Sequence, residues 1–336
     1  MSPVCVEAMF QGLRAHHIDY EACHAYVNLW SWPMRLEKRQ ATGKEAMNPT
    51  HAAASRKAGV FKCTASDAQS LYLVVAYWIK KTVLTAGLEV PLCEMFLKLT
   101  IVLDLVFAAG RKGAIAPQVL AAAIESFMQV FSDVVGDESM IPKFHLMMHL
   151  VFQLERYGFL PRCATLERKH KRVKRFLDAL RNHSKNEMSL LAEVTCASLS
   201  TLDTSEYLDL RIGLVQPRSP TSAVKEWCAA HWGAGDYLMA HEARYSEWEC
   251  CSKGDVVAVR CGGGWLAAKI WLFLSVAGEP IAIASLMQLV RRDPDSSTWR
   301  DVDDAKLVDL TDILVTFVFA DLGGEITVLH PYSLRG

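Results

Sequence analysis

DVVAVRCGGGWLAAKIWLFLSVAGEPIAIASLMQLV, residues 255–290, is the stretch of the chain that decides the fold class. Its runs of Val, Ile, Leu and Trp are separated by glycines at 262–264 and at Gly278. Short apolar runs between such breaks are typical of β-strands joined by tight turns. Similar runs follow at 307–319 and 325–329. We therefore expect five short strands that form a small antiparallel β-barrel or a strongly bent sheet.

The residues upstream of this stretch have a helical period instead. Apolar residues recur at spacings of three and four along two segments, which predicts two helices with one buried face each. These residues are Leu92, Phe96, Leu99, Leu103 and Val106, and then Val119, Ala123, Phe127, Val130 and Val134. Thr64 and Asp67 have the spacing of a capping box, so a further helix is expected to begin there. Residues 10–30 are predicted as one helix, and residues 43–59, which Pro49 interrupts, as a loop.

Together these patterns predict an α+β protein in three parts. Residues 1–200 form a mainly helical region, residues 201–250 a linker with short helices, and residues 251–336 a small β domain. By analogy of fold alone, that domain is expected to be SH3-like or BAH-like.

Composition limits the class of protein. About half of the residues (51%) are hydrophobic and 22% are charged, which is the profile of a globular chain that buries a core. The apolar segments 71–79 and 92–109 are too short or too interrupted by charge to span a bilayer, so they are interpreted as core helices. The N-terminus does not have the pattern of a signal peptide, and the ten cysteines include no CxxC pair. We expect reduced thiols and an intracellular protein without a membrane partner.

Charge is distributed unevenly along the chain. The formal net charge is −1. Nevertheless, the segment 162–185 carries nine Lys or Arg against Glu167 and Asp178, a local net charge of +7. Four apolar residues and one histidine within it recur at the helical spacing and predict an amphipathic basic helix over 165–185. They are Leu166, His170, Val173, Leu177 and Leu180.

A longer unit around this segment resembles part of a known family. Its motifs are Pro142-Lys143-Phe144-His145, then His149, then Arg156-Tyr157-Gly158-Phe159-Leu160-Pro161, and finally Glu167-Arg168-Lys169-His170-Lys171 with Lys174-Arg175-Phe176. About 35 residues match in order and spacing the C-terminal part of CACTA-type DNA transposases, as in divergent, repetitive transposase-like genes of protists.

The resemblance implies the helical insertion and the end of a ribonuclease H-like domain. In that family two Asp and one Glu hold two divalent ions, Mg²⁺ or Mn²⁺, for strand transfer, and Glu167 matches the last carboxylate by position. This chain departs from the family because it contains no strand-rich segment with two Asp upstream of the helices. Asp19, Asp67 and Asp104 instead fall within or at the caps of predicted helices. One carboxylate cannot organise two metal ions, so we expect no autonomous catalysis and no cofactor in this chain unless an intact site is completed elsewhere.

The resemblance also implies contact with DNA. The candidate phosphate-binding residues are Arg168, Lys169, Lys171, Arg172, Lys174, Arg175 and Arg181. The alternative is that these cations only form a solvated helix face. The most favoured function is a transposase-derived remnant in the nucleus that binds DNA through the basic helix. The alternatives are a non-enzymatic module that binds a protein partner through the β domain, or a chain without a selected activity. No small-molecule substrate is indicated.

Several other motifs have a structural and a chemical interpretation. His145 and His149 have the i, i+4 spacing of a metal-binding pair, but the favoured interpretation is that both are hydrogen-bonded core histidines. Free thiols explain the irregularly spaced Cys228, His231, His241, Cys250 and Cys251 as well as a zinc site would. The three glycines at 262–264 favour a hairpin turn over a phosphate-binding loop, because they lie between two predicted strands.

Overall fold

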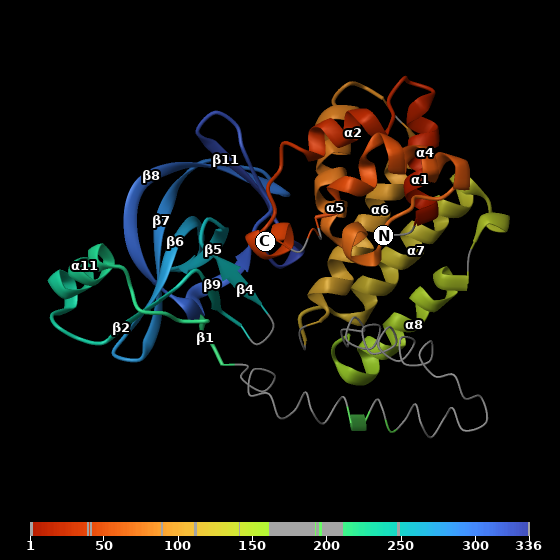
Figure 1. Ribbon diagram of the computed structural model, residues 1–336. Helices are drawn as coiled ribbons and strands as arrows, with labels where there is room; N and C mark the ends of the chain where they lie inside the picture. Colours follow the sequence, from red (N-terminus) through yellow and green to blue (C-terminus); the bar gives the residue numbers. More distant parts are fainter. Residues whose placement is uncertain are drawn as a thin grey trace.

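The computed structural model describes residues 3–160 and 211–334, except residues 39, 41, 89, 111, 112, 141, 247 and 248, together with residues 192, 195 and 196. Helices make up the N-terminal part and antiparallel sheets the C-terminal part, so the α+β prediction is confirmed. The two parts lie side by side, and the C-terminus lies between them (Figure 1).

The N-terminal part is built of helices and short helical turns. In chain order they are α1 (Pro3–Arg14), α2 (Tyr20–Val27), α3 (Met34–Lys38), η1 (Lys44–Met47), α4 (Pro49–Ala58), α5 (Ala65–Trp78), η2 (Ile79–Val83), α6 (Pro91–Ala108), α7 (Pro117–Val135), η3 (Asp137–Ser139) and α8 (Pro142–Tyr157). Thr64 and Asp67 form the predicted capping box at the start of α5. Residues 142–157 form a single helix.

Two local predictions are wrong for identifiable reasons. Residues 43–59 are not a loop but contain η1 and α4, because Pro49 occupies the first position of α4, where no backbone N–H is needed. The Asn48 side chain caps that helix by accepting from the His51 amide at 2.9 Å.

Residues 10–30 are not one helix either. The chain turns after Arg14, and Asp19 then caps a separate helix, α2.

Helix α6 lies at the centre of the helical part because it is buried on two faces. Cys93 and Phe96 pack in a cluster with α1, α2 and α5. Leu99 and Leu105 pack in a second cluster with α7 and α8. A helix in this position needs more than a single apolar stripe.

Helix α7 was predicted in the right place, and Phe127 is buried as expected, but the buried face is shifted by about one residue from the predicted one. Its buried residues are Leu120, Ile124, Phe127 and Phe131, whereas Val119 is 47% exposed. By length and apolar composition α7 is also the one helix of the described residues that could cross a membrane. Its four buried residues pack in the second cluster, whereas most of the helix is not buried.

The C-terminal part contains two antiparallel sheets and one helix. Its strands are β1 (Gly213–Val215), β2 (Tyr237–Ala240), β3 (Glu242–Arg244), β4 (Cys250–Ser252), β5 (Val256–Cys261), β6 (Gly264–Val276), β7 (Glu279–Arg292), β8 (Ser296–Asp309), β9 (Ile313–Thr316), β10 (Phe319–Asp321) and β11 (Glu325–Leu329). Helix α11 (Ser222–Trp232) and the short turns η5 (Leu310–Asp312) and η6 (Tyr332–Leu334) complete it.

The larger sheet has eight strands in the order β10-β11-β8-β7-β6-β5-β9, and β2 pairs with β6 beside β5. The smaller sheet has the order β1-β3-β4. Strands β1 to β4 therefore lie in the segment 201–250 or at its end, where sequence had suggested a linker with short helices. Within that segment α11 packs its buried Cys228 against strands of the larger sheet.

A closed barrel is not found among the described strands. The order of the larger sheet is open, and its terminal strands β9 and β10 follow each other directly along the chain. Phe317, between them, donates from its backbone to Val256 O at 2.8 Å, and Leu329 donates to Val318 O at 3.1 Å. One extended segment thus contacts both margins of a strongly curved sheet, and the predicted barrel is replaced by a bent sheet (Figure 1).

The helical part and the sheets share contacts of three kinds. Ser31 and Phe319 exchange two backbone hydrogen bonds of 2.7 and 3.0 Å. Ala320 and Leu329 of the larger sheet are buried in the helical cluster that contains Trp30 and Trp78. The buried Asp255 carboxylate accepts from the backbone amides of Met34 and Ser252, both at 2.7 Å, so it fixes the start of α3 to the turn before β5. Burial raises the pKa of Asp255.

Candidate functional site

All of the residues predicted to bind DNA or to form a vestigial catalytic centre lie outside the described residues. These are Glu167, Arg168, Lys169, Lys171, Arg172, Lys174, Arg175 and Arg181. Their functional assignment stays a prediction from sequence.

The three aspartates of the helical part that were considered as metal ligands have structural partners. Asp19 caps α2 through the Tyr20 amide at 2.8 Å and pairs with Arg56 at 2.7 Å. Asp67 belongs to the capping box of α5. Asp104 is buried in α6 and accepts from the Tyr72 hydroxyl at 2.9 Å. The prediction that all three lie within helices or at their caps is confirmed.

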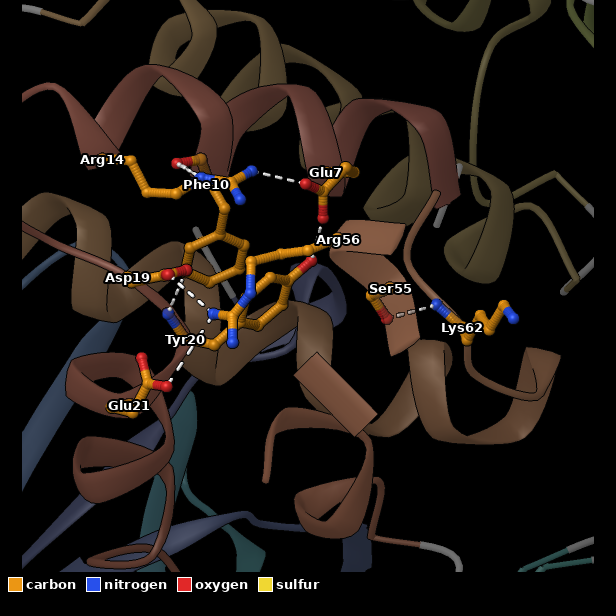
Figure 2. A network of polar contacts seen from close by, with 9 residues as sticks. All are labelled: Glu7, Phe10, Arg14, Asp19, Tyr20, Glu21, Ser55, Arg56 and Lys62. Carbon is orange, nitrogen blue, oxygen red and sulfur yellow. Dashed lines mark hydrogen bonds and ion pairs between the residues drawn. The ribbon is translucent and has the colours of Figure 1, made fainter. Parts of the chain in front are cut away.

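A polar network surrounds the beginning of α2 (Figure 2). Glu7 of α1 is only 6% exposed, and it accepts from the Tyr20 hydroxyl at 2.6 Å and pairs with Arg14. The Tyr20 ring stacks on Phe10 with centroids 3.9 Å apart. Burial, followed by the hydrogen bond to Glu7, raises the pKa of Tyr20. The phenol therefore stays protonated as a donor, and the network stabilises the contact between α1 and α2.

His145 and His149 are exposed on the outer side of α8, so the prediction of core histidines is wrong. The reason is that α8 buries Phe144 and Leu154, which lie on a different side of the helix. The two Nε2 atoms are 3.2 Å apart, and the rings meet edge to face with centroids 4.9 Å apart. Two ring nitrogen atoms that could bind a metal ion thus lie close together on an accessible surface.

A recess of about 260 Å³ lies where the helical part meets the turn between β7 and β8. Its ionic groups are paired across that boundary: Lys80 with Asp295 at 2.5 Å and Lys81 with Asp293 at 3.2 Å. Because each ammonium already has a carboxylate partner, this arrangement joins the two parts of the molecule and does not present an activated acid or base.

An aromatic cluster lies beside strands β6, β8 and β11. The half-buried Trp265 contacts Trp299, Phe317 and His330, with centroids 5.2 to 5.6 Å apart. The exposed Arg292 guanidinium lies 4.5 Å from the Trp265 ring centroid and 5.8 Å from that of Trp299. This geometry is favourable for a cation–π interaction, so the cluster already holds one cation of the chain itself.

The residues considered for a zinc site do not assemble into one. Cys228 is buried in α11, the His231 ring contacts the Trp227 carbonyl at 2.8 Å, and the His241 ring contacts Arg218 at 2.7 Å. The described residues contain no group of three or more His, Cys, Asp or Glu side chains that could hold a metal ion. Gly262 and Gly263 form the predicted two-residue hairpin turn between β5 and β6, with Gly262 at φ +56°.

Sequence reasoning missed the Glu7 network and the Trp265 cluster. Their members are far apart in sequence: Tyr20 lies 13 residues from Glu7, and Ser297 lies 33 residues from the His330 ring that it contacts at 2.8 Å. No short sequence motif can therefore reveal these contacts. The proximity of His145 and His149, by contrast, was visible in their i, i+4 spacing, because such side chains are neighbours on a helix.

Comparison of the chain with protein-family models, with curated proteins and with solved structures found no match.

Proposed function

We propose that the protein is a transposase-derived DNA-binding protein of the nucleus that contacts DNA through the basic segment 165–185. The observation that carries the proposal is the local net charge of +7 over 162–185 in a chain of net charge −1. Cations concentrated in this way neutralise phosphates and release counterions, which gives sequence-independent, salt-sensitive affinity. In this proposal the helical part corresponds to the helical insertion and the end of a ribonuclease H-like domain.

We also propose that the chain alone does not catalyse strand transfer. The structural roles of Asp19, Asp67 and Asp104 support this, since each carboxylate already caps a helix or bonds a buried hydroxyl. Glu167 would then ligate Mg²⁺ or Mn²⁺ only if another chain supplied the remaining carboxylates. Mn²⁺-dependent strand transfer by the isolated wild-type protein that disappears in Glu167→Gln would contradict this part of the proposal.

DNA binding is tested on the full chain with a charge-matched control. The triple variant Lys171→Ala, Lys174→Ala, Arg175→Ala is expected to lose most of its affinity for duplex DNA. The slope of log affinity against log salt concentration is negative, and its magnitude is expected to decrease by roughly 0.9 for each lost phosphate contact. Affinity and slope are measured by fluorescence anisotropy at several salt concentrations.

The control removes three exposed cations elsewhere, Lys57, Lys225 and Arg260, and changes the net charge by the same amount. It is expected to bind nearly as wild type. Equal losses in the two triple variants would show that net charge, and not the basic segment, determines binding, and the proposal would fail.

The Trp265 cluster favours a second candidate function, a protein-interaction module in the β part. Arg292 occupies the aromatic surface of Trp265 and Trp299, and an Arg or Lys of a partner peptide would compete with it. Arg292→Ala is therefore expected to increase binding of basic peptides, and Trp265→Ala to abolish it. Trp227→Ala, on the exposed side of α11, is the control. Peptide binding that is unchanged in Trp265→Ala would exclude this candidate.

A further inference from the structure

Helix α8 presents two imidazoles to solvent as a consequence of its burial pattern. Phe144 and Leu154 are 3% and 2% exposed in the cluster shared with α6 and α7. His145 and His149 lie on the opposite, exposed side, one helical turn apart. Side chains at i and i+4 are neighbours on a helix, so both rings occupy the same stretch of surface.

The geometry of the two rings fits a single metal ion. A metal–nitrogen bond to histidine is about 2.0 to 2.1 Å long, so two Nε2 atoms 3.2 Å apart subtend about 100° at a shared ion. This angle lies close to the tetrahedral value and is also compatible with the right angles of an octahedral ion. No change of helix geometry is needed to bring the nitrogen atoms to this distance.

Neighbouring side chains limit the freedom of the rings. The Phe152 ring lies 6.2 Å from that of His149. The His145 and His149 rings contact each other edge to face, and their Nε2 atoms are 3.2 Å apart. An imidazole without a proton on Nε2 presents a lone pair there, so a metal ion beside both Nε2 atoms can bind both rings.

We propose that His145 and His149 form a two-histidine site on α8 for a divalent transition-metal ion, with Nε2 of each ring as ligand and water at the remaining positions. Imidazole selects Zn²⁺, Ni²⁺ and Cu²⁺, whereas Mg²⁺ and Ca²⁺ require oxygen ligands. The described residues provide no third His, Cys, Asp or Glu ligand to this group, so the coordination sphere stays open. The site is distinct from the Mg²⁺ or Mn²⁺ chemistry that Glu167 would serve, and it does not depend on DNA binding.

The test is calorimetric titration of the full-length protein with NiCl₂ at pH 7.5, and with MgCl₂ as the comparison ion. Wild type is expected to bind one Ni²⁺ ion. The Ni²⁺ affinity of His145→Ala and that of His149→Ala are each expected to be about 100-fold lower, because either change removes the advantage of an intramolecular second ligand. Mg²⁺ is expected to give no specific heat.

His51→Ala is the matched control, because His51 is also exposed at a helix but its Nδ1 lies 2.6 Å from the Glu45 carbonyl instead of facing another ring. This variant is expected to keep the tight Ni²⁺ site. Circular dichroism checks that all variants are folded, and NMR of the imidazole nitrogens is expected to show two rings perturbed at one equivalent of Zn²⁺. Ni²⁺ affinity in His149→Ala equal to that of wild type would overturn the proposal.

Discussion

Glu7 shows, at the scale of single residues, how the helical core accommodates a buried carboxylate. Its two oxygens have one partner each, the Arg14 guanidinium and the Tyr20 hydroxyl. A buried ionised group is tolerated only when its hydrogen-bonding capacity is satisfied. Removal of one partner therefore lowers the free energy of unfolding by more than an average hydrogen bond contributes.

Tyr20→Phe is therefore expected to lower the free energy of unfolding by about 1.5 to 3 kcal/mol, because the hydroxyl bonds a charged acceptor. The ring and its stacking on Phe10 are retained, so the change isolates the hydrogen bond. Urea denaturation followed by circular dichroism measures it. Tyr157→Phe, at a residue that is 48% exposed, should leave stability unchanged. An equal effect of both substitutions would mean that the Glu7 contact contributes nothing.

Buried thiols make stability sensitive to alkaline pH. Burial raises the pKa of Cys93 to about 12, above its ordinary value of 9.0. The thiol is protonated in both states below pH 9, so its contribution is fully present there. Between pH 9 and 12 the unfolded chain loses this proton and the folded chain keeps it, which lowers stability by up to about 1.4 kcal/mol per pH unit.

Cys93→Ala is thus expected to flatten the fall of stability between pH 9 and 11, although it lowers stability at pH 7 through lost packing. Urea midpoints under reducing conditions at pH 7, 9, 10 and 11 provide the measurement. The exposed Cys261→Ala is the control and should keep the wild-type slope. If the slope of Cys93→Ala equals that of wild type, Cys93 does not contribute to the alkaline loss.

Residue-level predictions from sequence succeeded only where both partners were close along the chain. The Thr64 and Asp67 pair was found because its members are three residues apart, and it forms the expected reciprocal bonds. The contact of Asp255 with Met34 could not be found, because 221 residues separate the two along the chain. His145 and His149 were predicted to be core histidines, but α8 buries Phe144 and Leu154 on its other side and leaves both imidazoles exposed.

At the scale of elements, the capping box of α5 can be tested directly. Thr64→Ala removes the side chain that accepts from the Asp67 amide at 3.1 Å, and it is expected to cost about 1 kcal/mol. Thermal unfolding followed at 222 nm measures the change. Ser66→Ala, an exposed residue in the same turn, should have little effect. A cost for Ser66→Ala as large as that for Thr64→Ala would argue against a specific cap.

Strand β8 shows why some elements escaped prediction. Its sequence, SSTWRDVDDAKLVD, has few apolar residues and contains four aspartates, so only its last residues, from Leu307, fell within an expected strand. The strand forms because β7 and β11 pair with it on either side and Trp299 is fully buried. Its polar residues lie mostly on exposed positions. Pairing with neighbouring strands thus overrides the local propensity of the sequence. The intrinsic preference of residues for strands depends more on context than their preference for helices does.

The whole molecule is held together by apolar contacts more than by its ion pairs. Lys80, Lys81 and their aspartate partners are partly exposed, and such pairs contribute between 0 and about 1 kcal/mol each. Leu329 of β11, by contrast, is 3% exposed within the helical cluster. Burial of a side chain of this size contributes several times as much.

Leu329→Ala is therefore expected to destabilise the protein by about 2 to 5 kcal/mol, and Lys80→Ala with Lys81→Ala by less than about 2 kcal/mol. Both parts should unfold in one transition, so far-ultraviolet circular dichroism and tryptophan fluorescence are expected to give the same midpoint. Separate midpoints in wild type would show that the helical part and the sheets are independent folding units.

The sharing of one core by distant segments has a consequence for synthesis of the chain. The helical members of the cluster that contains Trp30 are complete at Phe96, but Ala320 and Leu329 join it only after more than 220 further residues have been synthesised. At about 5 to 20 residues per second, the roughly 220 intervening residues keep this surface of the nascent helices uncovered for about 10 to 45 seconds. During this time the uncovered apolar surface is a site at which nascent chains can aggregate.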